Sequence, residues 1–82
     1  MKDGIYVTEN GIEYEVYKNQ IMVEHKNGFY GCLYGKSSMS IFKNNKEVLH
    51  TGSRTPNTPE ELYDVLETMP QFLEMVEQLK KE

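Results

Sequence analysis

Short runs of alternating apolar and polar residues occupy the first fifty positions of the chain. The runs are rich in Val, Ile, Tyr and Phe, which favour β-strands, and turn-forming pairs separate them. The runs read IYVT, IEYEVY, QIMVEHK, FYGCLYG, MSIFK and KEVLH, and the pairs are Asn10-Gly11, Lys18-Asn19, Asn27-Gly28, Lys36-Ser37 and Asn44-Asn45. Asn-Gly is a strong hairpin signal because both central residues of a type I′ turn have positive φ. The pattern predicts an antiparallel meander of five or six strands over residues 5–50.

The register of this sheet follows if every turn contains two residues. The residues that flank each turn then pair and point to the same face. Three rows of side chains result: Ile5, Val16, Ile21, Tyr34, Met39 and His50; Val7, Tyr14, Val23, Cys32, Ile41 and Val48; and Glu9, Ile12, His25, Tyr30, Lys43 and Lys46. Because the first two rows are almost entirely apolar, we expect this face to be buried.

A helical pattern follows a linker at residues 51–58. Thr58, Pro59 and Glu61 match a capping box with proline at the first helical position. Apolar residues then recur at helical spacing in two stretches, Leu62, Val65 and Leu66 in the first and Phe72, Val76 and Leu79 in the second. Because Pro70 would break a helix interior, the sequence predicts two short helices, near residues 59–67 and 69–81, or one kinked helix.

These elements fit one α+β domain. A chain of 82 residues has room for a single domain with a modest core. The meander at 5–50, open or curled, is followed by the linker at 51–58 and by the helical segment at 59–81. We expect the helical segment to pack on one face of the sheet.

Composition restricts the setting in which the protein works. Cys32 is the only cysteine, so no intrachain disulfide forms, and a reducing compartment is expected. No signal-peptide core and no membrane-spanning apolar run is present. Residues 1–58 carry seven Lys/Arg and six Asp/Glu, whereas residues 59–82 carry two and seven. We therefore expect a soluble cytoplasmic protein without general affinity for nucleic acid.

The stretch NGFYGCLYGKSSMS, at residues 27–40, has the glycines and the final Gly-Lys-Ser of a phosphate-binding loop. Gly31 and Gly35 enclose three residues where that loop needs four, and Tyr30 stands where its first glycine would be. A β-prone run follows Lys36, where the motif requires a helix. We assign the stretch to sheet and turn, with Gly31 marking a bulge or close packing over the strand.

No catalytic, metal-binding or cofactor-binding residue is predicted. His25 and His50 lie on the order of 19 Å apart in the predicted register, too far to share a metal. Cys32 is predicted to be a buried thiol with a raised pKa. We expect no cofactor, no small-molecule substrate and no enzymatic activity. A small enzyme or metal protein that uses His25, Tyr30 or His50 would need a pocket where polar groups converge.

The second face of the later strands is also apolar. Its residues are Met22, Phe29, Leu33, Phe42 and Leu49, whereas the early strands carry polar residues there. The sheet could curl to bury both faces, the helices could divide between the faces, or a partner could cover one of them. Because exposed apolar patches mark association surfaces, the favoured function is a small non-enzymatic binding or adaptor protein that acts through protein–protein contacts, as a homodimer or with another protein.

Two alternative functions use charged residues. A single-stranded nucleic acid could bind the basic and aromatic stretch at residues 36–54, through Lys36, Lys43, Lys46 and Arg54 together with Phe42. Alternatively, the acidic helical segment could occupy a basic groove on a partner and inhibit it. Its acidic residues are Glu60, Glu61, Asp64, Glu67, Glu74 and Glu77.

Overall fold

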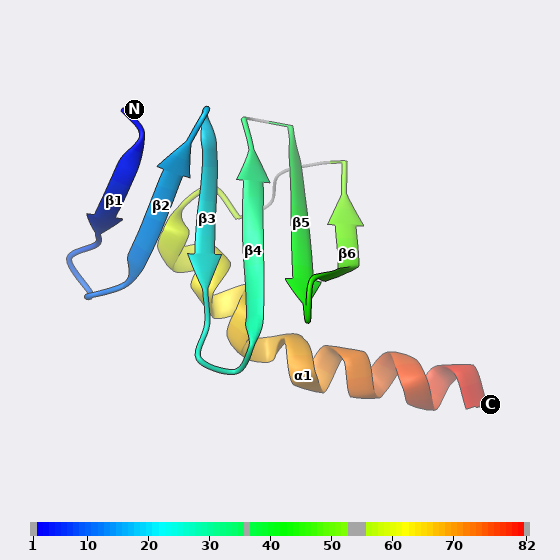
Figure 1. Ribbon diagram of the computed structural model, residues 1–82. Helices are drawn as coiled ribbons and strands as arrows, with labels where there is room; N and C mark the ends of the chain where they lie inside the picture. The colour runs from blue at the N-terminus through cyan, green and yellow to red at the C-terminus, as the bar shows by residue number, and fades with distance from the viewer. Residues whose placement is uncertain (1, 36, 53–55, 82) are drawn as a thin grey trace.

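The computed structural model describes residues 2–35, 37–52 and 56–81, which form a six-stranded antiparallel sheet and one helix (Figure 1). The strands lie side by side in chain order: β1 (Gly4–Val7), β2 (Glu13–Tyr17), β3 (Gln20–Glu24), β4 (Phe29–Tyr34), β5 (Ser38–Lys43) and β6 (Lys46–Thr51). The helix, α1 (Pro59–Lys81), crosses one face of the sheet. The predicted α+β meander is confirmed, and its sheet is open, with β1 and β6 at the edges.

The two turns without glycine have the predicted geometry. Lys18 and Asn19 have φ values of 49° and 66°, and Asn44 and Asn45 have values of 54° and 62°. Positive φ at both central residues defines a type I′ turn, which matches the twist of the flanking strands. The predicted pairing of Val16 with Ile21, which follows from the first of these turns, is therefore confirmed.

The two Asn-Gly turns contain three residues instead of two. In the β3–β4 turn, the His25 N–H donates to the Phe29 carbonyl oxygen at 2.9 Å, and Gly28 has a φ of 94° while Asn27 does not have positive φ. This is a type I turn closed by a left-handed glycine. The β1–β2 turn, with Gly11 at a φ of 83°, has the same hydrogen bonds. The predicted register is therefore wrong by one residue for β1 against β2 and for β4 against β3, and the predicted register of β5 against β4 is wrong by one residue as well.

A one-residue shift turns every side chain of a strand to the other face of the sheet. Val23 pairs with Gly31, which pairs with Ile41, so Cys32 lies on the opposite face from both Val23 and Ile41. The prediction that Cys32 belongs to their buried row is wrong. A second irregularity is a bulge between Ile41 and Phe42. Because of it, Ile41 pairs with Leu49 and not with Val48, the predicted partner.

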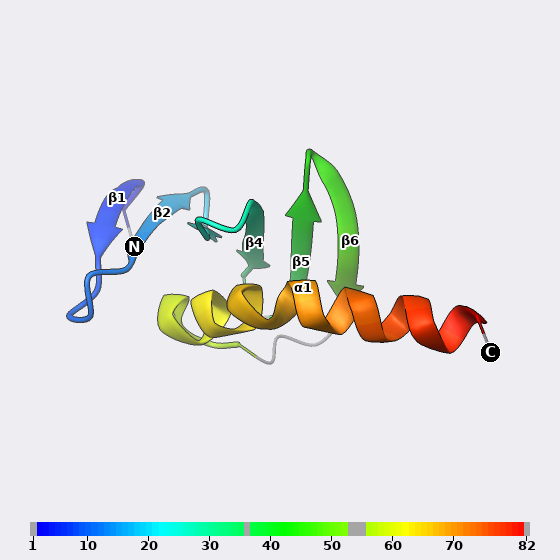
Figure 2. The ribbon, with the colours of Figure 1, turned by 90° about the horizontal axis from the view of Figure 1, so that it is seen from below.

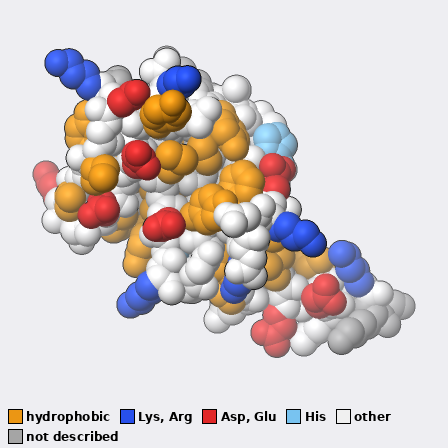
Figure 3. Space-filling model, viewed as in Figure 1, with side chains coloured by type: hydrophobic (Ala, Val, Ile, Leu, Met, Phe, Trp, Pro, Cys, Tyr) orange, Lys and Arg blue, Asp and Glu red, His pale blue; other side chains and the backbone are white. Residues whose placement is uncertain are grey.

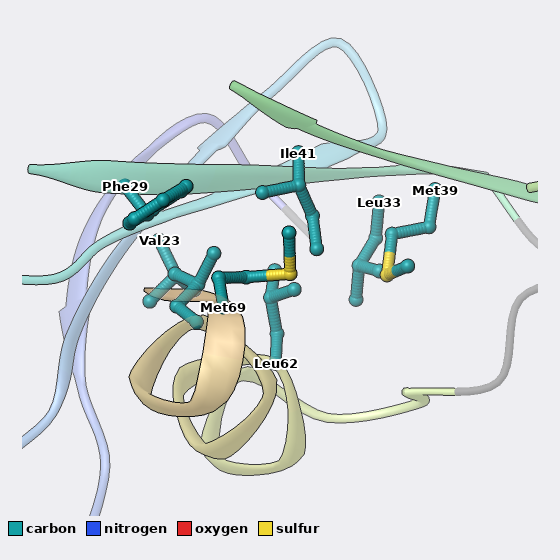
Figure 4. Packing of buried hydrophobic residues seen from close by; sticks show 8 residues of the cluster. Val23, Phe29, Leu33, Met39, Ile41, Leu62 and Met69 are labelled. Carbon is teal, nitrogen blue, oxygen red and sulfur yellow. The ribbon is translucent and has the colours of Figure 1, made fainter. Parts of the chain in front are cut away.

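The core fills the space between α1 and the sheet face that it covers, the inner face (Figure 4). Three helix residues, Leu62, Leu66 and Met69, are at most 2% exposed. The sheet contributes Val23, Phe29, Leu33, Met39 and Ile41. We call the opposite face, which α1 does not cover, the outer face.

α1 approaches the sheet closely over Gly31. A Cβ atom at this position would lie 2.8 Å from Leu62 Cδ1, closer than real Cβ contacts. The missing side chain therefore lets Leu62 pack directly on the β4 backbone, where its burial is complete. The close packing expected over Gly31 is confirmed.

α1 is one helix that continues through Pro70, the second of the two predicted arrangements, and its direction changes along its length in Figure 1. The capping box is present, since the Glu61 N–H donates to Thr58 Oγ1 at 3.1 Å. Proline has no N–H and leaves the carbonyl four residues earlier without its helical donor. That carbonyl belongs to Leu66, and Asn27 Nδ2 in the β3–β4 turn donates to it at 2.9 Å.

The second half of α1 extends past the sheet, as the views in Figures 1 and 2 agree. The long axis of the molecule measures 47 Å against 25 and 21 Å for the other two. Among the described residues, no helix combines the length and the apolar character that crossing a lipid bilayer requires.

We expect Gly31→Ala to lower the free energy of unfolding by about 1–3 kcal/mol, because the added methyl group collides with Leu62. Leu62→Ala alone should cost about 2–5 kcal/mol. The double variant should lose less than the sum of the two, as measured by urea denaturation. Gly52→Ala is the control, since a Cβ atom there meets nothing within 4 Å. Additive losses would contradict the close contact.

Asn27→Ala should lower the free energy of unfolding by about 1–3 kcal/mol, because it leaves the Leu66 carbonyl without a donor. In a Pro70→Ala background the loss should be smaller, since the introduced alanine supplies the helical N–H. Asn27→Asp keeps an acceptor for the Phe29 N–H, which Asn27 Oδ1 binds at 3.0 Å, and removes only the donor. An equal cost of Asn27→Ala in both backgrounds would show that Asn27 does not support the helix.

Candidate functional site

The five residues predicted to form one interaction patch are divided between the two faces of the sheet. Phe29 and Leu33 are 2% and 0% exposed and belong to the core, and Leu49 packs against it. Met22 and Phe42 lie on the outer face and are partly exposed. The shifted β4 register and the bulge moved the other three residues inward, so the predicted patch is not a single surface.

Two rows of side chains cross the outer face from β1 to β6. By the strand register they are Ile5, Glu15, Met22, Cys32, Ser40 and His50, and Val7, Glu13, Glu24, Tyr30, Phe42 and Glu47. Figure 3 shows this face, with hydrophobic side chains gathered over its middle and acidic side chains among them. Ile5 and Val7 are 68% and 63% exposed. The outer face is therefore an apolar and acidic surface that no described segment covers.

A shallow recess of about 300 Å³ lies over β1–β4 on this face. Ile5, Met22 and Tyr30 contribute apolar surface to it, and three carboxylates, those of Glu13, Glu15 and Glu24, also line it. Within residues 2–35, 37–52 and 56–81, no lysine or arginine forms an ion pair with these carboxylates. The recess thus combines an apolar surface with negative charge that no ion pair within the described part of the chain neutralises.

A stacked aromatic pair adjoins the recess. The rings of Tyr30 and Phe42 have centroids 5.1 Å apart and planes 13° apart. The Tyr30 hydroxyl donates to Asn45 Oδ1 at 3.4 Å, a weak bond to the β5–β6 turn. Aromatic pairs prefer offset-stacked geometries of this kind. The two rings therefore form a packed apolar pair, the aromatic shelf, beside the carboxylates.

Ser40 and His50 form a hydrogen bond on the outer face, with 2.8 Å between Oγ and Nδ1. Glu47 Oε1 approaches the same ring nitrogen at 3.9 Å. In a catalytic triad the acid holds one imidazole nitrogen while the other takes the serine proton. Both groups use Nδ1 here, and Ser40 is 1% exposed, so the arrangement is structural. Sequence reasoning missed Ser40 because the β5–β6 bulge decides its pairing with His50.

Cys32 is a free, buried thiol on the outer side of the sheet. Burial raises the pKa of Cys32, and a hydrogen bond from Tyr34 opposes part of the rise. Burial also raises the pKa of Tyr34. The predicted buried thiol with a raised pKa is confirmed, although it faces away from the core.

His25 is placed far from His50, in the β3–β4 turn. It is 8% exposed, and its ring packs against Tyr63 with centroids 4.5 Å apart. The Asn27 N–H donates to His25 Nδ1 at 3.1 Å, so Nδ1 is the acceptor and the ring shapes the turn. Across the described part of the chain, no group of three or more His, Cys, Asp or Glu side chains could hold a metal ion.

Of the basic residues proposed for nucleic-acid binding, the two that the structure describes do not join the partly exposed ring of Phe42. Lys43 shares the inner face with Phe29, and its Nζ lies 4.5 Å from the centroid of that ring. Lys46 pairs with Lys43 at the β5–β6 turn. Phe42 points to the outer face, as its stacking on Tyr30 shows. Two further residues of that prediction, Lys36 and Arg54, lie outside the described residues.

We expect Cys32 to react with a disulfide reagent such as DTNB at pH 8 at least about tenfold more slowly in the native protein than in urea. The raised pKa reduces the thiolate fraction, and burial blocks access. The control is Asn10→Cys in a Cys32→Ser background, because Asn10 is exposed. Equal rates for native and unfolded Cys32 would contradict the buried position.

Comparison of the chain with protein-family models, with curated proteins and with solved structures finds no match. The chemistry of the outer face therefore remains the basis on which a function is assigned.

Proposed function

We propose that this protein is a small non-enzymatic binding protein that holds a basic, partly apolar segment of a partner protein against the outer face of its sheet. The observation that carries the proposal is the recess over β1–β4, where Ile5, Met22 and Tyr30 meet three carboxylates that have no lysine or arginine counter-ion among the described residues. Protein–protein contact is the function that sequence analysis favoured, and Met22 and Phe42 remain in the proposed surface.

The apolar residues of the outer face supply the contact area. Ile5 and Val7 are more than half exposed, although β-branched residues are usually half-buried on sheets. Contiguous exposed apolar surface marks sites of association. The Tyr30–Phe42 pair adds a preorganised aromatic shelf, and aromatic residues are enriched among those that dominate binding energy.

The carboxylates specify the charge of the partner. Glu13 and Glu24 lie on neighbouring strands of the outer face, and like charges side by side destabilise a sheet. Lysine and arginine relieve this repulsion and also place their methylene groups on apolar surface. A partner segment that alternates basic and apolar side chains therefore matches the recess on both counts.

The other functions have less support from the geometry. For nucleic-acid binding, Lys43 lies on the inner face and Phe42 on the outer face, so these two residues of that prediction do not form one surface. That the acidic face of α1 occupies a basic groove on a partner and inhibits it stays a prediction. The cytoplasmic location also stays a prediction. A free buried Cys32 is consistent with a reducing compartment.

The probe for this proposal is a synthetic eight-residue peptide of alternating arginine and leucine, titrated into isotope-labelled protein and followed by NMR. We expect chemical-shift changes confined to β1–β4, with the largest near Met22 and Tyr30. Glu15→Gln combined with Glu24→Gln should weaken binding by about tenfold, since two charge-assisted contacts are lost. Added salt should weaken it as well.

Two controls accompany this titration. A peptide with glutamate in place of arginine should not bind, and Glu74→Gln, at an exposed acid on α1, should leave the affinity unchanged. Shifts spread over α1, or equal binding of the acidic peptide, would refute the proposed site.

A further inference from the structure

The second half of α1, residues 70–81, carries large apolar side chains that its own chain leaves in solvent. We call this segment the arm. Phe72, Met75 and Leu79 are 44%, 62% and 69% exposed. The arm is about 18 Å long at 1.5 Å per residue. Leu73 near its start still packs against the core, and its end extends beyond the sheet in Figures 1 and 2. Exposed residues at this spacing are typical of an unpaired amphipathic helix.

These residues continue a stripe that begins in the first half of the helix. Val65, Phe72 and Leu79 are separated by seven-residue steps, which drift by only about 20° each around a helix. The core residues Leu62 and Met69 lie roughly 60–80° away from Phe72 around the axis. α1 therefore has one broad apolar face, whose first half, including Val65, packs against the core and whose second half, at Phe72 and Leu79, is exposed to solvent.

A groove lies beside Val65 in the first half of α1. Its volume is about 350 Å³, and its lining residues are Met39, Thr51, Pro56, Glu61, Asp64 and Val65. α1 packs on β3 and β4, so this groove lies between the helix and the next part of the inner face. Met39, Pro56 and Val65 make it apolar, and Glu61 and Asp64 place negative charge at it.

The arm has the complementary chemistry. It ends with Leu79 followed by Lys80, an apolar side chain beside a cation, whereas the groove offers Val65 beside Asp64. The arm and the groove lie at opposite ends of one helix, so the arm cannot reach the groove of its own chain. A second copy that runs in the opposite direction brings the two together.

We propose that two copies of this chain form an antiparallel dimer in which the arm of each copy lies in the groove of the other. A two-fold axis relates the two copies, so the contact between arm and groove occurs twice in the dimer. This dimer uses a different surface from the outer face and does not depend on the proposed function.

Charge favours the antiparallel direction. The first half of α1 carries Glu60, Glu61, Asp64 and Glu67 and no lysine or arginine, whereas in the arm Lys80 and Lys81 balance Glu74 and Glu77. Parallel pairing would set acidic halves side by side and lysines side by side. Antiparallel pairing sets Lys80 near the partner's acidic half and also opposes the two helix dipoles.

The first test is the solution mass of the full chain across a concentration series, by sedimentation or light scattering. The mass should rise from 9.6 kDa toward twice that value. Leu79→Asp should raise the dimer dissociation constant at least about tenfold, because it places a charge in an apolar contact. Its circular dichroism should stay native, since Leu79 is 69% exposed in the monomer.

Val7→Asp is the matched control, because Val7 is a similarly exposed apolar residue on the outer face. It should leave the dissociation constant unchanged. A chain that is monomeric at all concentrations, or a Leu79→Asp variant that dimerises as tightly as the native chain, would overturn the proposal.

Charge reversal tests the direction of pairing. Lys80→Glu should weaken the dimer, and adding Asp64→Lys in the same chain should restore it in part. A parallel dimer would show no such restoration, which would overturn the antiparallel arrangement. Glu24→Gln, in the proposed peptide site, should leave the mass unchanged. A failure of the dimer and a failure of the outer-face function are therefore distinguishable.

Discussion

The contact between Leu62 and the bare backbone of Gly31 fixes where the helix lies on the sheet. Any side chain at position 31 would occupy the space of the Leu62 methyl groups, so α1 is seated over β4 at this point. A second anchor stands one turn further along, where Asn27 donates to the Leu66 carbonyl that Pro70 leaves unpaired. Two fixed points determine the course of a helix, and the remaining surfaces follow from it.

The surfaces proposed for binding are the parts of the molecule that the position of this helix leaves uncovered. The helix covers the inner face at β3 and β4, so the outer face stays open with its carboxylates and aromatic pair. Because α1 crosses the sheet obliquely and continues past it, the arm stays bare and a groove stays open beside Val65. A small chain buries a limited fraction of its surface, and pairing of the arms would bury apolar side chains such as Leu79 that the monomer leaves exposed.

The assignment of residues to faces depends on the length of each turn. Asn-Gly fits a two-residue turn, but the same pair also ends a three-residue turn in which only the glycine has positive φ. The β3–β4 turn takes the longer form, where Asn27 gains hydrogen bonds to Phe29 and to the helix. The contact with the helix cannot be read from the sequence of the turn alone. Because the longer turn sets the register of β4, Phe29 lies in the core and Cys32 lies on the outer face.

The sequence by itself determined the meander, the Thr58 cap and the helical span, because each depends on local backbone preferences or on alternation along one segment. At Gly31 it left a bulge and close packing as alternatives, and the contact with Leu62 decided between them. Only the tertiary structure decided that α1 continues through Pro70, since the compensating donor, Asn27, is remote in sequence. It also decided that Met22 and Phe42 lie on the outer face while Leu33 and Leu49 lie on the inner face. The physical reason is that one additional residue in a turn or a bulge turns the side chains of the following strand to the other face of the sheet. Contacts between segments distant in sequence decide whether that additional residue is present.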